Sequence, residues 1–170
     1  MSDPVPAAPL VQLPRFACSV AKRCDLIYKT EWSQELSWAQ TLRFAEYVDA
    51  FEAKEGVEIF RQDQSGHYLC LLLEGAVDII REDSSGDKKV LATILPGKTF
   101  GEMSLIDGQP RSATAVAIQD SKLLVLTEQN FRRMIDHHPR LGSTVLMKLA
   151  KLMSARLRRT SGMLVDHLDD

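Results

Sequence analysis

The spacing of hydrophobic residues changes twice along the chain, and each change marks a change of predicted secondary structure. Between residues 33 and 47 apolar side chains recur at three- and four-residue steps, which predicts a helix capped by Ser33 or Ser37. From Val48 onward, short apolar runs alternate with turn residues, a pattern typical of a β barrel or jelly roll. After Thr127 the helical spacing returns. The pattern therefore predicts a β domain that helices precede and follow.

The strands of this domain are predicted from short apolar segments that end at polar or glycine-containing turns. The predicted strands span residues 48–54, 57–60, 68–73, 76–81, 89–95, 113–118 and 122–126. The segment 83–87, DSSGD, has the composition of a hairpin loop, and Pro96-Gly97 is a turn signal after the strand at 89–95. Even spacing of such short strands favours antiparallel pairing in one compact β unit.

Two helices are predicted at the C-terminal end. Thr127 is a suitable N-cap for a helix over 128–137, and Pro139 suits the first turn of a longer helix. The longer helix carries one mainly apolar stripe at three- and four-residue steps. The stripe consists of Leu146, Leu149, Met153, Leu157, Thr160 and Leu164. Such a stripe fits packing onto the β domain of the same chain, and it equally fits a parallel two-helix seam in a homodimer.

Composition and charge narrow the functional classes. The 170 residues suffice for one domain with its own core and a few additional helices. A net charge of −2 creates no global field that attracts nucleic acid or an anionic membrane. No apolar run is long enough to span a bilayer, and the N-terminus lacks the pattern of a secretory signal. Arg156, Arg158 and Arg159 are better explained by the negative end of a helix than by DNA binding. We therefore expect a cytoplasmic protein.

The chain divides into three predicted parts. Residues 1–31 form a tail and a short helical segment, residues 32–138 the β unit with flanking helices, and residues 139–170 the long helix and its end. Four prolines within the first 14 residues indicate a poorly ordered tail or an extended strap. Neither the three cysteines nor the four histidines have the spacing of a metal site, so no metal is expected.

The chemistry is concentrated in residues 100–117, FGEMSLIDGQPRSATAVA. Gly101 permits a close approach between backbone and ligand because it has no Cβ atom. Residues 103–106 are predicted to form one helical turn, whose first N–H groups lack internal partners and favour a phosphate. Arg111 offers a planar guanidinium that can donate two hydrogen bonds to one phosphate. Glu102 is an acceptor when ionised and therefore suits a sugar hydroxyl.

The motif F-G-E-x-x-L…P-R-S-A-T in this segment resembles the phosphate-binding cassette of the cyclic nucleotide-binding domain family. That resemblance implies an eight-stranded β jelly-roll barrel with an N-terminal helix and two C-terminal helices. It also implies that Arg111 contacts the cyclic phosphate and Glu102 the ribose 2′-hydroxyl. The remaining cassette positions implied to line the site are Gly101, Met103, Ser104, Ser112 and Ala113.

The same resemblance implies further ligand contacts. Each of these residues also has a simpler structural explanation. Ile79 and Leu91 lie on strands that flank the cassette in the family and would cover the base and ribose, although each also suits a core position. Thr160 and Ser161 match two adenine-contacting hydroxyl residues of catabolite activator-type members, and they would equally cap a helix end.

Two positions depart from the commonest family pattern. Lys98 stands where an aspartate is usual, and Asp63 stands where the family often has a turn glycine. Aspartate tolerates the left-handed conformation better than most residues, so the second change is mild. Neither residue removes a ligand contact that the resemblance implies.

The resemblance implies a cytoplasmic receptor that binds cAMP without chemical conversion and relays binding through its C-terminal helices to an effector protein. One alternative is a truncated or standalone relative of a catabolite activator-type regulator. Direct DNA binding is not expected, because the sequence ends soon after Ser161, too early for a two-helix reading module. Another alternative is a module for cGMP or a cyclic dinucleotide. An enzyme is not expected, because no nucleophile–base pair, metal set or Walker loop is present.

Overall fold

The computed structural model describes residues 13–168, and its side chains up to residue 163. Most of the proline-containing segment 1–14 and the side chain of Leu164 therefore lie outside the described residues. Eight strands form two antiparallel four-stranded sheets, in the orders β1-β8-β3-β6 and β2-β7-β4-β5. The strands are β1 (Val48–Ala53), β2 (Glu58–Phe60), β3 (Tyr68–Glu74), β4 (Val77–Glu82), β5 (Lys88–Ile94), β6 (Thr99–Phe100), β7 (Thr114–Ala117) and β8 (Ser121–Thr127).

The predicted fold class, a β jelly roll with flanking helices, is confirmed by this arrangement. The two sheets pack face to face and do not close into a continuous barrel. β6 is the strand that the hydrophobic pattern missed, because two residues are too few to show an alternation. The helical segments are α1 (Val20–Tyr28), η1 (Glu31–Ser33), α2 (Trp38–Ala45), α3 (Glu102–Asp107), α4 (Glu128–His137) and α5 (Pro139–Leu168).

Local capping chemistry sets the helix boundaries. Of the two predicted caps of α2, Ser37 is the one used, since its hydroxyl accepts from the Gln40 N–H at 3.2 Å. The Gln40 side-chain oxygen accepts from the Ser37 N–H at 2.9 Å and completes a capping box. Thr127 caps α4 by accepting from the Asn130 N–H at 3.1 Å, as predicted. Pro139 is the first residue of α5, also as predicted.

Two hydrophobic clusters lie on opposite faces of the first sheet. One fills the space between the sheets, and its members include Cys70, Leu72 and Val125. The other lies between that sheet and the helices, and there Leu69 and Leu71 pack against α1, α2, α4 and α5. Alternate residues of β3 thus serve the two clusters, because successive side chains of a strand point to opposite faces.

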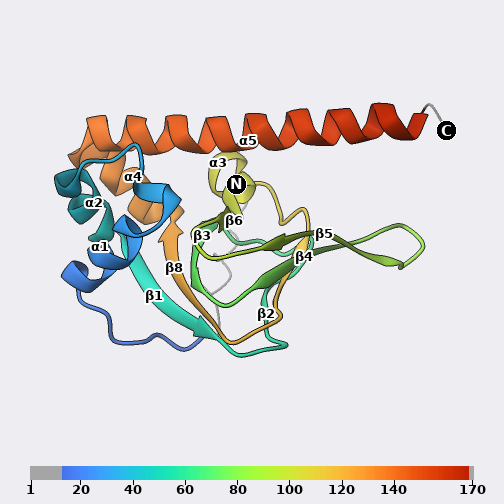
Figure 1. Cartoon of the computed structure of the whole chain (residues 1–170), viewed down its shortest axis with the longest axis horizontal. Coiled ribbons are helices and arrows are strands. Elements are labelled where there is room, and N and C mark those ends of the chain that lie inside the picture. Colours follow the sequence, from blue (N-terminus) through green and yellow to red (C-terminus); the bar gives the residue numbers. More distant parts are fainter. Residues whose placement is uncertain (1–12, 169–170) are drawn as a thin grey trace, which may run out of the picture.

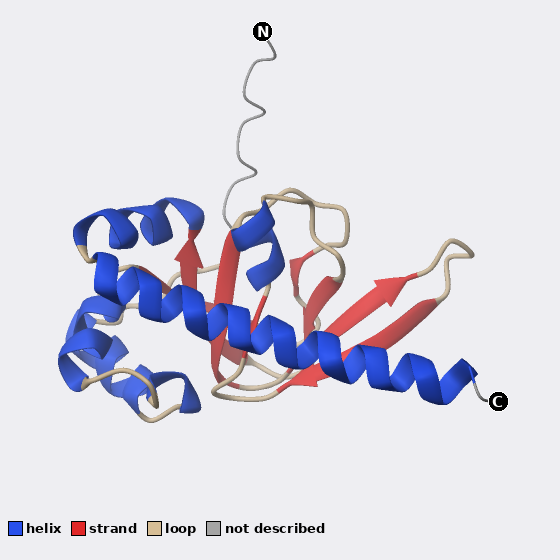
Figure 2. Cartoon of the chain, turned by 90° about the horizontal axis from the view of Figure 1, so that it is seen from above, coloured by secondary structure: helices blue, strands red, loops and turns tan. Residues whose placement is uncertain are grey.

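Helix α5 runs across the whole molecule (Figures 1 and 2). Its first half covers the helical cluster, its middle passes over α3, and its last turns run alongside the β4–β5 hairpin. The hydrophobic side chains of its described part that are fully buried are Leu141, Val145 and Leu149. Among the members of the predicted stripe whose side chains are described, only Leu149 is fully buried, whereas Leu146 and Leu157 are 43% and 68% exposed. Packing within the chain therefore uses a different face of α5 from the one that these two exposed leucines occupy.

Candidate functional site

The predicted cassette is formed by β6, by α3 and by the chain that follows α3. Gly101 joins β6 to α3 with a φ of 81°, in the left-handed region that glycine enters without strain. A Cβ atom on Gly101 would lie 2.7 Å from Nη1 of Arg111 and 3.1 Å from the Tyr68 carbonyl oxygen. The glycine is therefore needed twice, for its backbone conformation and for the space that the arginine occupies.

Arg111 is buried beneath the cassette, with 2% of its surface exposed. Its Nη1 donates to the Gly101 carbonyl at 2.8 Å, and its Nη2 donates to the Tyr68 carbonyl at 2.9 Å. The guanidinium carbon lies 4.0 Å from the Phe60 ring centre and 4.2 Å from the Tyr68 ring centre. Two aromatic rings and two carbonyl groups thus fix the plane of the guanidinium.

The charge of Arg111 has no anionic partner among the described residues. No carboxylate forms an ion pair with it, and its Nε atom has no hydrogen-bond partner. Burial raises the pKa of the neighbouring Cys70 thiol to about 12, and burial also raises the pKa of the Tyr68 hydroxyl, so both groups stay neutral. Burial also lowers the pKa of Arg111 itself. A buried cation in neutral surroundings is costly, and an incoming anion would remove that cost.

The backbone of Arg111 is held by the turn after β2. The Asp63 N–H donates to the Arg111 carbonyl at 2.8 Å, and the Arg111 N–H donates to the Gln64 carbonyl at 3.0 Å. Asp63 has a φ of 64° and is the non-glycine residue with positive φ in the described chain. The expectation that aspartate would adopt this conformation in place of a turn glycine is confirmed.

Glu102 is the second buried charge of the site, with 1% of its surface exposed. It forms an ion pair with Arg156 of α5, while neither carboxylate oxygen accepts a hydrogen bond of normal geometry from the described residues. Arg156 also donates from Nη2 to the Thr99 carbonyl at 2.7 Å, and its side chain is 44% exposed. Burial, and secondarily the charge of Arg159, lower the pKa of Arg156. Helix α5 is thus attached to the cassette.

The role of Arg156 corrects the sequence-based interpretation. The sequence assigned this arginine to the negative end of the helix, but α5 continues to Leu168, and Arg156 lies well before its end. Its partner Glu102 is 54 positions away in sequence, so no local spacing could reveal the pair. Lys98 was predicted to remove no ligand contact. Its side chain pairs with Glu31 of η1, and among the described interactions it contacts neither Glu102 nor Arg111.

The other predicted cassette residues differ in how far their side chains are buried. Ser104 and Ala113 are buried, whereas Met103 is half exposed. The Ser112 hydroxyl lies 3.8 Å from the Met103 sulfur. The site therefore offers two exposed groups, Met103 and Ser112, above the buried pair of Arg111 and Glu102.

The predicted contacts outside the cassette are less directly supported by the geometry. Ile79 of β4 is partly buried against the cluster between the sheets, and Leu91 of the edge strand β5 is 58% exposed. Thr160 and Ser161 are exposed on α5, and the Thr160 hydroxyl donates to the Arg156 carbonyl at 3.1 Å, within its own helix. The contacts of these four residues with a nucleotide stay predictions.

Between residues 13 and 168, no helix is both long and apolar enough to cross a membrane. The same part of the chain contains no group of three or more His, Cys, Asp or Glu side chains arranged to hold a metal ion. The arrangement that remains is a buried guanidinium and a buried carboxylate at the two ends of a short helix-containing loop, which suits an anion that also carries hydroxyl groups.

Comparisons with known proteins show which sequences and structures this chain resembles. The sequence model described as "Cyclic nucleotide-binding domain" matches residues 50–138, just over half of the chain. A cyclic AMP receptor protein of Thermus thermophilus is 39% identical over 104 residues, which are 61% of this chain and 46% of that protein. A cAMP-dependent protein kinase regulatory subunit of Eremothecium gossypii is 37% identical over 91 residues, which are 52% of this chain and 19% of the subunit.

A solved structure gives the same result for the fold. A cyclic nucleotide-binding domain from Methylobacillus flagellatus superposes with a TM-score of 0.75 at 27% identity, covering 86% of this chain and 82% of that domain. The chain spans less than half the length of the two curated relatives named above. The part that matches the family model, residues 50–138, runs from β1 to the end of α4 and contains the cassette.

Proposed function

We propose that this chain, which belongs to the cyclic nucleotide-binding domain family, is a receptor that binds cAMP in the cassette of β6 and α3. The observation that carries the proposal is the state of Arg111. Its guanidinium is buried, oriented by two rings and two carbonyls, and without an anionic partner among the described residues. A cyclic phosphate supplies the missing negative charge in a form that a planar guanidinium can bind through two hydrogen bonds.

Each part of the ligand has a proposed partner in the cassette. Arg111 and the first N–H groups of α3 bind the phosphate, and Ser112 adds a hydroxyl donor. Glu102 accepts from the ribose 2′-hydroxyl, and its oxygens lack normal hydrogen bonds in the described chain. We propose that Gly101, Met103, Ser104 and Ala113 line this part of the site, that Ile79 and Leu91 cover the sugar and base, and that Thr160 and Ser161 contact the base.

The identity of the base is tested by a competition between ligands. The receptor of Thermus thermophilus that resembles this chain is named for cyclic AMP, which supports cAMP over the alternatives. In isothermal titration we expect the full chain to bind cAMP at one site per chain, and we expect cGMP and cyclic di-GMP to displace it only at about tenfold higher concentration or more. A preference for cGMP or for the cyclic dinucleotide would reject cAMP as the ligand while retaining the cassette as the site.

We propose that helix α5 relays occupancy of the cassette to a partner. Besides its buried hydrophobic residues, three charged side chains attach α5 to the rest of the chain: Arg156 pairs with Glu102, Lys151 with Glu35 at 3.3 Å, and the largely buried Lys148 lies over the Trp32 ring at 5.2 Å. A ribose hydroxyl that competes for Glu102 changes the first of these attachments. The ligand shifts α5 only as far as it binds the two positions of the helix differently.

The output is proposed to be a protein–protein contact in the cytoplasm, without DNA binding, membrane insertion or catalysis by this chain. The exposed apolar positions of α5, including Leu146 and Leu157, are proposed to form the seam of a homodimer. An effector protein would then respond to the position of α5 or to the dimer.

The attachment between α5 and the cassette can be tested with Arg156→Gln. This change leaves the buried Glu102 carboxylate without its cation, so we expect the free energy of unfolding to fall by about 2 kcal/mol in chemical denaturation. Hydrogen exchange should become faster in the second half of α5. Arg158→Gln is the matched control, because that residue is exposed on the same helix and forms no ion pair among the described residues. Equal effects of the two changes would contradict a specific attachment through Arg156.

A further inference from the structure

Strand β4 is longer than its neighbour β7 at the end nearest the cassette. The two strands pair antiparallel, with Ile80 opposite Thr114, the first residue of β7. Continued for two more residues, this register would place Glu82, the last residue of β4, opposite Ser112. Ser112 belongs instead to the predicted cassette, and within residues 13–168 its backbone forms no hydrogen bond with another backbone group. The cassette thus takes from the sheet the residue with which Glu82 would pair.

The Gln62 side chain occupies the place that Ser112 leaves. Its Oε1 accepts from the Glu82 N–H at 3.0 Å, and its Nε2 donates to the Glu82 carbonyl at 3.2 Å. One side-chain amide thus supplies both the acceptor and the donor that a residue opposite Glu82 would supply in an antiparallel ladder. The Gln62 N–H also donates to the Thr114 hydroxyl at 3.0 Å, which fixes the amide at the point where β7 begins.

The turn that contains Gln62 also holds the residue before Ser112. The Asp63 N–H donates to the Arg111 carbonyl at 2.8 Å, and the Gln64 carbonyl accepts from the Arg111 N–H at 3.0 Å. One turn therefore satisfies the end of β4 and fixes the backbone of the proposed phosphate-binding arginine. Ser112 gains nothing by joining the ladder, because the backbone groups that could bind it there are already bonded.

We propose, on the basis of the receptor function proposed above, that Gln62 is a positioning residue of the nucleotide site. Its amide replaces Ser112 in the β ladder and so leaves the Ser112 hydroxyl and N–H available to the phosphate. Without this amide, the open N–H and carbonyl of Glu82 favour extension of β7 by two residues. That extension turns Ser112 toward β4 and away from the ligand. Gln62 itself touches no part of the nucleotide and acts through Ser112.

The test compares the full wild-type chain with Gln62→Met, whose side chain has a similar length but lacks both polar groups of the amide. Without ligand, the Ser112 amide should exchange with solvent at least about threefold more slowly in the variant, because it then donates to Glu82. Hydrogen exchange followed by NMR measures this rate. Isothermal titration should give a cAMP affinity about fivefold lower, as expected for the loss of one hydrogen bond of average net strength.

A merely structural role of Gln62 would lower the melting temperature without protecting the Ser112 amide. Gln119→Met is the matched control, because Gln119 is exposed in the turn at the other end of β7 and its side chain forms no hydrogen bond among the described residues. It should leave the cAMP affinity and the Ser112 exchange rate within about twofold of wild type. Equal effects of the two variants, or a folded Gln62→Met protein with unchanged Ser112 exchange or unchanged cAMP affinity, would overturn the proposal.

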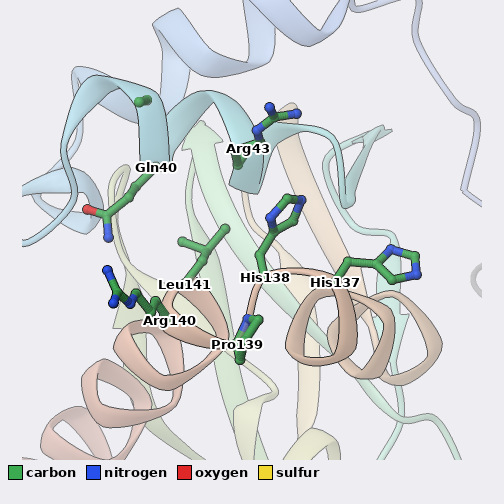
Figure 3. A pocket seen from close by; sticks show the side chains of 8 residues that line it. Gln40, Arg43, His137, His138, Pro139, Arg140 and Leu141 are labelled. Carbon is green, nitrogen blue, oxygen red and sulfur yellow. The ribbon is translucent and has the colours of Figure 1, made fainter.

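The same titration also tests where the nucleotide binds. A hollow between α2, the end of α4 and the start of α5 (Figure 3) shares no lining residue, among the described residues, with the cassette or with the turn after β2. A nucleotide bound in that hollow would not respond to Gln62→Met, and the proposal would fail. A wild-type chain that binds no cAMP would contradict the proposed receptor function. The ligand-free exchange of Ser112 would then still decide whether Gln62 keeps this residue out of the ladder.

Discussion

Replacing Arg111 with alanine is expected to weaken cAMP binding by about a hundredfold, which is about 3 kcal/mol of binding free energy. The phosphate would lose a cation that is already oriented and already removed from water. The cAMP affinity of Arg111→Lys should lie between those of the wild type and Arg111→Ala, because lysine keeps the charge but cannot form two parallel hydrogen bonds. Isothermal titration of the three proteins measures these differences.

The interpretation of the Arg111 variants requires that they fold. The alanine variant loses the contacts with Phe60 and Tyr68, but it also loses a buried charge without an anionic partner, so these two effects on the free energy of unfolding oppose each other. Circular dichroism melting establishes folding before the titration. Arg61→Ala is the matched control, since Arg61 is an exposed arginine close to the same turn. A folded Arg111→Ala protein with wild-type affinity would remove this residue from the site.

The second large effect is expected for Gly101→Ala. The added methyl group would lie 2.7 Å from Nη1 of Arg111 and 3.1 Å from a backbone oxygen, at a φ of 81° that L residues rarely adopt. We expect the free energy of unfolding to fall by about 3 kcal/mol, from backbone strain and displacement of the guanidinium together. Binding of cAMP should weaken in parallel because the guanidinium no longer occupies its place.

Gly56→Ala provides a control that isolates the contact from the backbone strain. Gly56 has nearly the same φ, 83°, but its added methyl group would meet nothing within 4 Å. We expect this variant to lose about 1 kcal/mol of stability and to bind cAMP normally. Thermal and chemical denaturation of both variants measure the difference. If Gly56→Ala were as destabilising as Gly101→Ala, the close approach of Arg111 to Gly101 would not contribute to the loss of stability in Gly101→Ala.

Much of this fold could be predicted from the sequence because its signals are local. The cap at Thr127 and the first-turn Pro139 fix α4 and α5 from their own side chains, and the glycine before Glu102 marks the start of α3. The choice between Ser33 and Ser37 needed one more local feature, the Gln40 side chain that completes the capping box. Elements of four or more residues carry such signals, whereas the two residues of β6 do not.

The electrostatic surroundings of the proposed site could not be predicted from the sequence. The motif indicated Arg111 and Glu102, and the structure places both at the cassette in buried positions. That Arg111 would be held by backbone carbonyls and two rings, and Glu102 by an arginine of α5, depends on contacts between distant segments. The face of α5 that packs on the domain is likewise set by tertiary contacts, and Leu146 and Leu157 lie off that face.

The central claim is that the partly unsatisfied guanidinium of Arg111 receives the ring phosphate. The most direct measurement is the NMR signal of the Arg111 Nε–H group in the ¹⁵N-labelled wild-type chain, assigned by its loss in Arg111→Lys. This N–H lacks a partner in the described chain and is shielded from water, so a new charge-assisted hydrogen bond must change its proton shift. The account predicts a downfield shift that saturates together with cAMP binding. An unchanged Arg111 signal at full occupancy of the protein by cAMP would contradict it.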